Sequence, residues 1–203
     1  PSLPGFTFPV KALQAPGDPS RWFVVEQGGK VWTFTNAANV STRTLFADLT
    51  DRVVWGGELG LLGMAFHPQW PAVPDVFLVY TRGNPYRTYL SRFHTSNGGL
   101  TIDSSAAGEQ PVLVVDQPSD THKAGDLAFG PDGYLYLTLG DGGGDYDTYG
   151  NGQNLGTTLA KVLRLDVTGT GAGYAIPADN PFAGPGVAQC PPAGRSAAQP
   201  CPE

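Results

Sequence analysis

Short apolar segments bounded by turn residues dominate the pattern of hydrophobic and polar positions along the chain. Gly, Pro, Asp or Asn flank segments rich in aromatic and β-branched residues, which is typical of strands joined by turns. The pattern predicts strands at Trp22–Glu26, Lys30–Phe34, Gly63–Phe66, Val76–Tyr80, Tyr89–Phe93, Val112–Asp116, Asp126–Phe129, Tyr134–Leu139 and Ala160–Asp166. Helical periodicity is almost absent, and only Leu155–Leu159 predicts a short helical turn. We therefore expect an all-β fold.

A loose internal repeat underlies these strands. Each unit places a Pro-containing turn before a strand of alternating aromatic and aliphatic residues, and the turns contain Pro19, Pro68 and Pro131, which are 49 and 63 positions apart. Repeats of roughly 40–60 residues with several strands each predict the blades of a β-propeller. A β-sandwich is the alternative, but the shared turn-plus-strand unit favours the propeller. We expect residues 1–203 to form a partial propeller domain of about three to four blades that continues beyond residue 203.

Charge and hydropathy narrow the choice of partners. The net charge is −6 and no basic cluster occurs, so nucleic acid and anionic membrane surfaces are poor candidates. The longest apolar runs are a handful of residues, far short of the ~20 needed to span a bilayer. No charged segment followed by an apolar one opens the chain at Pro1, so we expect any signal peptide to have been removed.

The chain has two cysteines, Cys190 and Cys201, on either side of a loop rich in Pro, Ala and Gly. Their spacing is far from CxxC and no histidine lies near them in the sequence, which argues against a zinc site. A disulfide that closes the loop is the favoured interpretation, and it would raise the free energy of unfolding by about 3 kcal/mol. Two unpaired thiols are the alternative. A disulfide implies an oxidising compartment, either the periplasm or the cell exterior.

The most informative segment surrounds the Pro131-Asp132-Gly133 turn. Pro presets φ for the first corner and Gly permits a positive φ, so two antiparallel strands should leave this turn. His122 lies nine residues before Pro131 and Asp141 lies nine residues after Asp132, so we expect them to face each other at the open end of the hairpin. A carboxylate beside an imidazole fixes its tautomer, which makes His122 a candidate general base.

Other interpretations of this segment stay open. His122 can cap a turn while Asp141 bonds to its own glycine loop. Oxygen-bearing side chains follow in the same loop and are candidate calcium ligands, although their spacing fits no EF-hand and such loops are usually solvated turns. They belong to Asp141, Asp145, Asp147, Asn151, Gln153 and Asn154. Of the other histidines, we expect His67 to be structural and His94 to be exposed.

Longer motifs cover nearly the whole chain: residues 22–31, 57–68, 122–144, 152–166 and 174–182. Together they make the chain similar to the soluble aldose (glucose/sorbosone) dehydrogenases that depend on pyrroloquinoline quinone (PQQ). That resemblance implies a six-bladed propeller and an aldose substrate, with PQQ and Ca²⁺ as cofactors. It does not identify the sugar or the electron acceptor.

The resemblance also implies roles for individual residues. His122 is expected to take the proton of the sugar C1 hydroxyl while hydride passes to the quinone, and Asp141 is expected to orient it. Asp145 and Tyr146 are expected to contact the substrate because they lie near this site, and the resemblance does not assign them. Glu58 falls where PQQ-binding members often carry a Gln near the cofactor. The family's Arg-Asn-Pro segment and its later PQQ and calcium ligands lie beyond the position of residue 203.

The sequence departs from the family pattern in three places, and the first two bear on the cofactor. The usual His-Asn-Gly-Gly is replaced here by His122-Lys123-Ala124-Gly125, in which Lys123 would attract an anionic quinone and Ala124 would crowd it. Glu58 would repel the PQQ carboxylates unless it is protonated or paired. Ala160 replaces the usual Gly before a lysine.

Three functions therefore compete. The first is a periplasmic or secreted quinoprotein that oxidises aldoses at C1. The second is a non-catalytic propeller that binds a glycan or a protein, as hedgehog-interacting-type relatives do, and the departures at Lys123 and Ala124 lean towards it. The third is a hydrolytic calcium propeller such as a lactonase, which requires inward-facing acidic and amide side chains from several blades. The sequence shows no clear set of these, which argues against the third function. The family resemblance is the main reason to prefer the first.

Overall fold

A computed structural model describes residues 2–169, 171–186, 188–194 and 200–203. The described residues form strands and no helix, which confirms the all-β prediction. The strands are β1 (Pro9–Ala15), β2 (Asp18–Glu26), β3 (Lys30–Thr35), β4 (Thr44–Asp48), β5 (Leu61–Phe66), β6 (Asp75–Arg82), β7 (Arg87–His94), β8 (Gln110–Asp116), β9 (Ala124–Phe129), β10 (Leu135–Leu139) and β11 (Val162–Leu165).

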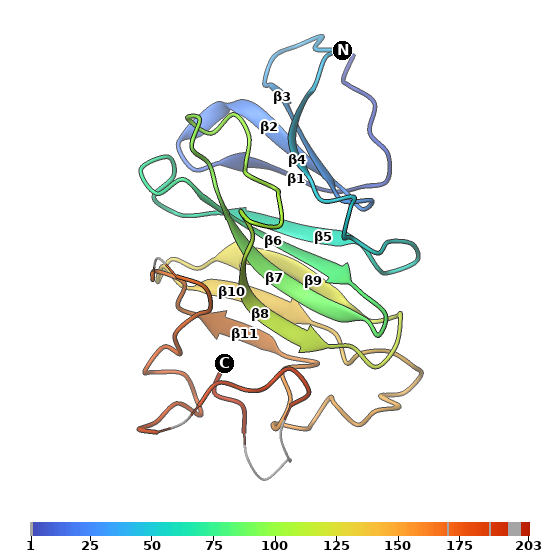
Figure 1. The fold of residues 1–203 in the computed structure, drawn as a ribbon, viewed down its shortest axis with the longest axis vertical. Helices are drawn as coiled ribbons and strands as arrows, with labels where there is room; N and C mark the ends of the chain where they lie inside the picture. Colours follow the sequence, from blue (N-terminus) through green and yellow to red (C-terminus); the bar gives the residue numbers. More distant parts are fainter. Residues whose placement is uncertain (1, 170, 187, 195–199) are drawn as a thin grey trace.

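The strands form three antiparallel sheets in chain order (Figure 1). β1–β4 and β5–β8 are four-stranded, and β9–β11 is three-stranded. Each strand pairs with its neighbour in the sequence, so every sheet is a meander. Beyond β11, an isolated antiparallel bridge joins Asp166 to Ala175.

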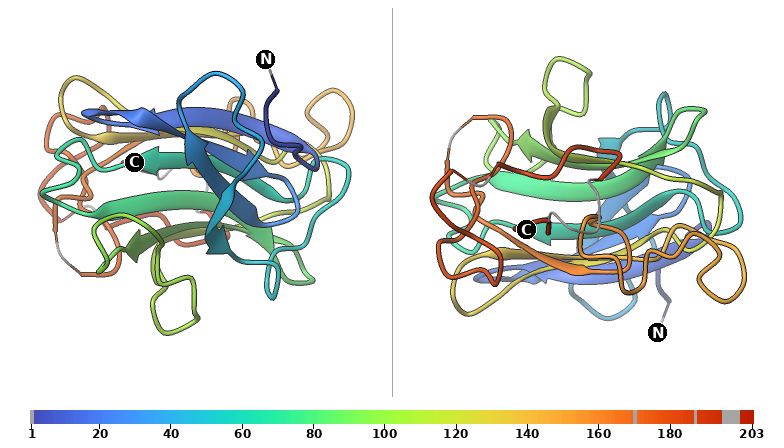
Figure 2. Two further views of the ribbon diagram at one scale, coloured as in Figure 1. Left: turned by 90° about the horizontal axis from the view of Figure 1, so that it is seen from above. Right: turned by 90° about the horizontal axis from the view of Figure 1, so that it is seen from below.

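The middle sheet is buried on both faces, which is the packing expected of a propeller blade between two others. Successive side chains of a strand point to opposite faces. Accordingly Val76, Leu78 and Tyr80 of β6 join the apolar core shared with the first sheet. Phe77 and Val79 join the core shared with the third sheet. Figure 2 shows β6 and β7 in a layer separate from β9–β11. Three consecutive blades of a partial propeller are thus present.

The first strands of the three sheets run in the same direction, side by side. A Cβ built on Gly63 of β5 would lie 3.2 Å from the carbonyl oxygen of Gly125 in β9. The carbonyl of Gln27, in the β2–β3 turn, accepts a hydrogen bond from Leu61 N, 2.9 Å away, at the start of β5. The loops before β1, β5 and β9 and the β2–β3, β6–β7 and β10–β11 loops therefore share one end of the molecule, here called the site end.

Nine predicted strands are present, but two strands were missed and one element was wrong. β1 is exposed or half-buried along most of its length and β4 is only five residues long, so neither carries a clear apolar pattern. The helical turn expected at Leu155–Leu159 is a series of bends and turns. There Asn154 Oδ1 accepts a hydrogen bond from Gly156 N and Thr157 Oγ1 accepts one from Leu159 N. Such local side-chain bonds compete with helical backbone bonding.

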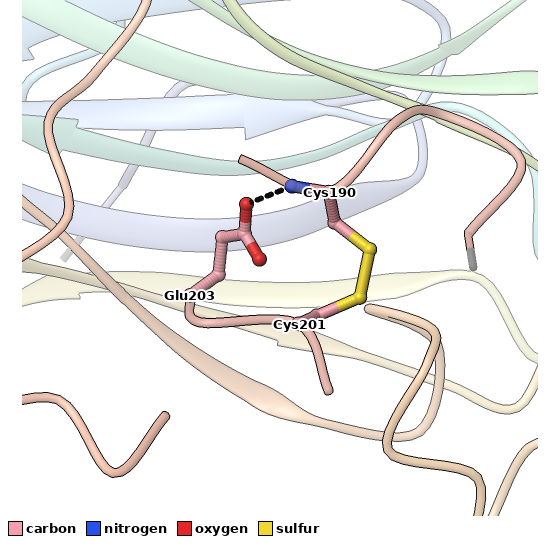
Figure 3. A group of neighbouring side chains, drawn as sticks. All are labelled: Cys190, Cys201 and Glu203. Carbon is pink, nitrogen blue, oxygen red and sulfur yellow. Dashed lines mark hydrogen bonds between the residues drawn. A yellow bond between two sulfur atoms is a disulfide. The ribbon is translucent and has the colours of Figure 1, made fainter. Parts of the chain in front are cut away.

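The C-terminal segment is closed by a disulfide between Cys190 and Cys201, as the sequence predicted (Figure 3). Backbone bonds dock this loop on the blades: Cys201 N donates to Leu155 O at 2.8 Å and Asp116 N donates to Pro192 O at 3.0 Å.

The part of the chain that the structure describes includes no helix with the length and apolar character required to cross a membrane.

Candidate functional site

The register of the β9–β10 hairpin brings His122 and Asp141 together. The expected turn forms between the two strands and Gly133 N donates to Gly130 O at 3.0 Å. A shift in the ladder then pairs Leu139 with Ala124, and the same register carried two residues further aligns Asp141 with His122. Without the shift, Asp141 would lie opposite residue 123. The expected side-by-side placement is therefore confirmed.

His122 and Asp141 form a hydrogen-bonded pair at the site end. Nδ1 of His122 lies 2.7 Å from Oδ1 of Asp141, and the histidine side chain is 45% exposed. The same Oδ1 accepts a bond from Gly143 N at 3.0 Å, and this N–H, together with His122, lowers the pKa of Asp141 below its ordinary value. Because Asp141 engages Nδ1, Nε2 is the nitrogen that can exchange a proton with a ligand.

Two further contacts fix the backbone of His122, whose φ is +52°. Oε2 of Glu58, from the loop before β5, accepts a hydrogen bond from His122 N at 2.5 Å. A Cβ at Gly140 would overlap the carbonyl oxygen of His122, so only glycine fits there. The carboxylate of Glu58 thus has a partner within the protein, which the sequence alone did not reveal.

Lys123 turns away from solvent. Lys123 is only 6% exposed, and its Nζ donates to Gln117 Oε1 at 3.0 Å. Gln117 in turn donates from Nε2 to Thr88 Oγ1 at 2.8 Å. Burial lowers the pKa of Lys123 to about 8, although Asp120, Glu58 and Asp141 act in the opposite direction. The ammonium group is therefore held between blades. The side chain of Ala124 lies outside the described part of the structure.

Asp145 and Tyr146 lie on the β10–β11 loop but are not brought into the pair. Both are exposed, and the side chain of Tyr146 is fully so. Within the described residues neither side chain has a hydrogen bond or ion pair to His122 or Asp141. Their role as substrate contacts stays a prediction.

The carboxylates of the same loop do not converge. Asp147 accepts backbone bonds from Asn151 N and Gly152 N at 2.8 and 2.9 Å, so it caps its own loop. Among the described residues, only Cys190, Cys201 and Glu203 bring three potential ligand atoms of His, Cys, Asp or Glu within 4.8 Å of one another. The two sulfurs there are bonded to each other (Figure 3), so this group is not a metal site.

Two residues that support the pair were not recognised as such from the sequence. Asn151 Nδ2 donates to the carbonyl oxygen of Asp141 at 2.7 Å. Lys161 Nζ donates to the carbonyls of Asn151 and Leu159, each at 2.9 Å. Both residues lie in or beside the 152–166 motif, and that motif was the sequence signal that could have pointed to them. Long-range contacts of this kind leave no periodic pattern in the sequence.

His67 and His94 behave as expected. His67 is buried, and its Nδ1 accepts a bond from Gln69 N at 3.2 Å, so it is structural. His94 is exposed and its Nδ1 lies 2.9 Å from Asp75 Oδ1.

The described residues fit one part of a PQQ-dependent site. A histidine whose Nδ1 is bound to a carboxylate lies at an open position, and Glu58 contacts its backbone N–H from the neighbouring blade. Binding of the quinone carboxylates requires cationic groups that face the ligand, whereas the ammonium group of Lys123 donates to Gln117. This part of the chain therefore fits the proton-accepting side of such a site better than the anion-binding side.

Comparison with curated proteins gives relatives of two kinds. HIPL2 protein of Arabidopsis thaliana is 30% identical over 83% of this chain and 32% of its own length. Human Hedgehog-interacting protein is 28% identical over 87% of this chain and 27% of its own length. Quinoprotein glucose dehydrogenase B of Acinetobacter calcoaceticus is 31% identical over 79% of this chain and 36% of its own length. The chain thus spans about a third of the length of these relatives.

Solved structures agree with the fold. The crystal structure of a glucose dehydrogenase-type oxidoreductase from Thermus thermophilus superposes with a TM-score of 0.68 at 28% identity, covering 88% of this chain and 47% of that one. The family model for glucose/sorbosone dehydrogenases matches residues 7–190, which is most of the chain. The protein therefore belongs to the glucose/sorbosone dehydrogenase family, as its motifs had indicated.

Proposed function

We propose that the full-length protein oxidises aldose sugars at C1 to lactones in a PQQ-dependent reaction. The observation that carries this proposal is the His122–Asp141 pair, with Nδ1 bound at 2.7 Å and the imidazole partly exposed. The similarity to a quinoprotein glucose dehydrogenase supports the same reaction class.

His122 takes the proton of the C1 hydroxyl on Nε2. Asp141 accepts the Nδ1–H bond, holds the ring in the tautomer that leaves Nε2 free, and stabilises the imidazolium that forms. Glu58 holds the backbone of the base through His122 N. PQQ, when bound, would supply the two-electron acceptor for the hydride that leaves C1.

Glu58 and Lys123 are the residues of this chain proposed to border the cofactor. Calcium and the remaining contacts to the quinone carboxylates are assigned to parts of the full-length protein outside this chain, since the acidic loop here caps itself. Asp145 and Tyr146 are proposed to approach the sugar from the β10–β11 loop. The disulfide supports a periplasmic or secreted location, because such bonds persist in oxidising compartments.

The second candidate is a non-catalytic propeller that binds a glycan or a protein. The burial of Lys123 against Gln117 favours this second function. Lys123 is the cation next to His122 in the sequence, and in its buried position it contributes little to a surface that binds anions. The similarity to Hedgehog-interacting protein supports the same interpretation.

The deciding experiment uses the full-length protein with PQQ and Ca²⁺ and follows aldose-dependent dye reduction. The test variant is His122→Ala. A matched control is His94→Ala, because His94 is also an exposed histidine bound to an aspartate. Turnover that requires PQQ and is lost only in the His122 variant supports the dehydrogenase. A folded protein with neither turnover nor PQQ binding supports the binding propeller.

A further inference from the structure

The β10–β11 loop carries Asn151, which supports Asp141, yet most of this loop is poorly packed. Residues 144–155, all of which the structure describes, are exposed or half-buried. In the same loop Tyr146 and Asp147 have φ values of +55° and +56°, a region that residues with a side chain rarely adopt. Such conformations persist only where the surroundings hold them. The geometry of the loop therefore depends on the segments that are packed against it.

One such contact comes from two short segments near the C-terminus, here called the clamp: residues 190–194 and 200–203. The disulfide between Cys190 and Cys201 joins the two segments (Figure 3). Cys201 N donates to Leu155 O at 2.8 Å, and Cys190 Sγ lies 3.7 Å from Gly156 O. Both ends of the disulfide therefore contact the β10–β11 loop at adjacent residues.

The clamp also approaches the loop through the backbone of Gly194. A Cβ built on Gly194 would lie 2.9 Å from the carbonyl oxygen of Gly156, so any larger residue would force the two segments apart. The clamp is anchored in turn on β8, where Asp116 N donates to Pro192 O at 3.0 Å. It therefore connects the second sheet to the loop that follows β10.

A short series of hydrogen bonds leads from the clamped residues to Asp141. Asn154 Oδ1 accepts a bond from Gly156 N at 2.9 Å, and Asn154 N donates to Asn151 O at 3.3 Å. Asn151 Nδ2 then donates to Asp141 O at 2.7 Å. Because Asp141 is the partner of His122, a displacement of Gly156 reaches the pair through only two intervening residues.

We propose that the clamp is a positioning element for the candidate base. Its contact with Gly156 keeps Asn151 where it holds Asp141 in line with Nδ1 of His122. The clamp acts on the pair through other residues, so it sets the orientation of the imidazole and takes no part in the proton transfer. A small misplacement of a catalytic group lowers the rate of the chemical step. The effect on turnover rests on the proposed dehydrogenase function, whereas the effect on the imidazole does not.

A pair of glycine variants tests the contact while the disulfide stays intact. Gly194→Ala adds a Cβ that pushes the clamp away from Gly156 O. Gly186→Ala is the matched control: its φ of +78° is close to the +79° of Gly194, so the backbone strain is alike, but its Cβ would meet nothing within 4 Å. Asn151→Ala removes the bond from Nδ2 to Asp141 O and tests the last step of the series.

Two readouts are taken in the full-length protein. Aldose oxidation with PQQ gives kcat and KM. Without PQQ, the ¹⁵N shifts of the neutral histidine rings give the tautomer of His122, whose signals are those missing from His122→Ala. Wild type should show the Nδ1–H tautomer. Gly194→Ala and Asn151→Ala should lower kcat by about 10-fold or more at unchanged KM and give a mixture of tautomers, whereas Gly186→Ala should match wild type.

Changes in kcat and tautomer in both Gly194→Ala and Asn151→Ala, but not in Gly186→Ala, support the positioning role. Equal results for the two glycine variants, a wild-type result for Asn151→Ala, or mixed tautomers in folded wild type overturn it. A tautomer that depends on Gly194 in a protein without aldose turnover keeps the role and rejects only the dehydrogenase proposal. Cys190→Ala/Cys201→Ala, which releases the clamp without adding a side chain, replaces Gly194→Ala if that variant does not fold.

Discussion

Oδ1 of Asp141 lies 2.7 Å from Nδ1 of His122 because the β9–β10 ladder shifts by one position before the strands end. A one-residue change of register moves every later side chain to a new partner. The bulge, rather than the turn alone, therefore selects which residue faces the carboxylate.

Replacing Asp141 by Asn should remove the charge that stabilises the protonated imidazole while keeping nearly the same shape. We expect turnover to fall on the order of 10²–10⁴-fold in the PQQ-loaded protein, with an unchanged circular dichroism spectrum. Asp103→Asn is the control and should leave kcat near that of wild type, because Asp103 accepts a similar bond from Ser105 N but lies in the β7–β8 loop at the other end of the molecule. Equal kcat in wild type and Asp141→Asn would show that the pair is structural only.

Lys123→Met should change the pH dependence of stability. The folded pKa of about 8 lies below the ordinary value of 10.5, so between these pH values the unfolded state binds more protons than the folded one. The stability of wild type relative to the variant should therefore rise as pH increases from 8 to 10.5. Urea unfolding at pH 7 and pH 10 measures this difference. Parallel curves for Lys123→Met and wild type would contradict the burial of Lys123.

Glu58→Gln should improve the affinity for PQQ. The amide oxygen can still accept the bond from His122 N, while the negative charge next to an anionic ligand is removed. Glu58→Ala is the matched comparison: it also removes the charge but leaves the N–H without its partner, at about 1 kcal/mol of stability. PQQ titration followed by absorbance gives the affinities. Weaker binding by the Gln variant than by wild type would mean that the carboxylate assists the cofactor.

The Cys190→Ala/Cys201→Ala double variant should be less stable than wild type by about 3 kcal/mol, because a crosslink over 11 positions restricts the unfolded chain. Equilibrium unfolding in urea without reductant measures the difference. Adding reductant should destabilise wild type by a similar amount and leave the double variant unchanged. A double variant as stable as oxidised wild type would show that the loop is held by its backbone bonds alone.

The sequence by itself determined the elements whose signals are local. Apolar runs between turn residues located nine of the strands, and the Pro131-Asp132-Gly133 turn predicted the hairpin whose open end carries both His122 and Asp141. The spacing of the two cysteines indicated their disulfide. These features depend on neighbouring residues, so alternation of side chains and turn chemistry are sufficient to predict them.

Only the tertiary structure decided the features that depend on contacts between blades. β1 and β4 owe their pairing to partner strands rather than to their own apolar pattern. The bond from His122 N to Glu58 and the meeting of Phe8 with Trp55 join residues from different loops. The burial of Lys123 depends on Gln117 of its own β8–β9 loop, which in turn bonds to Thr88 of β7. Such contacts arise when whole sheets stack, and the free energy that fixes them comes from the packed cores between the blades, which have no local sequence signature.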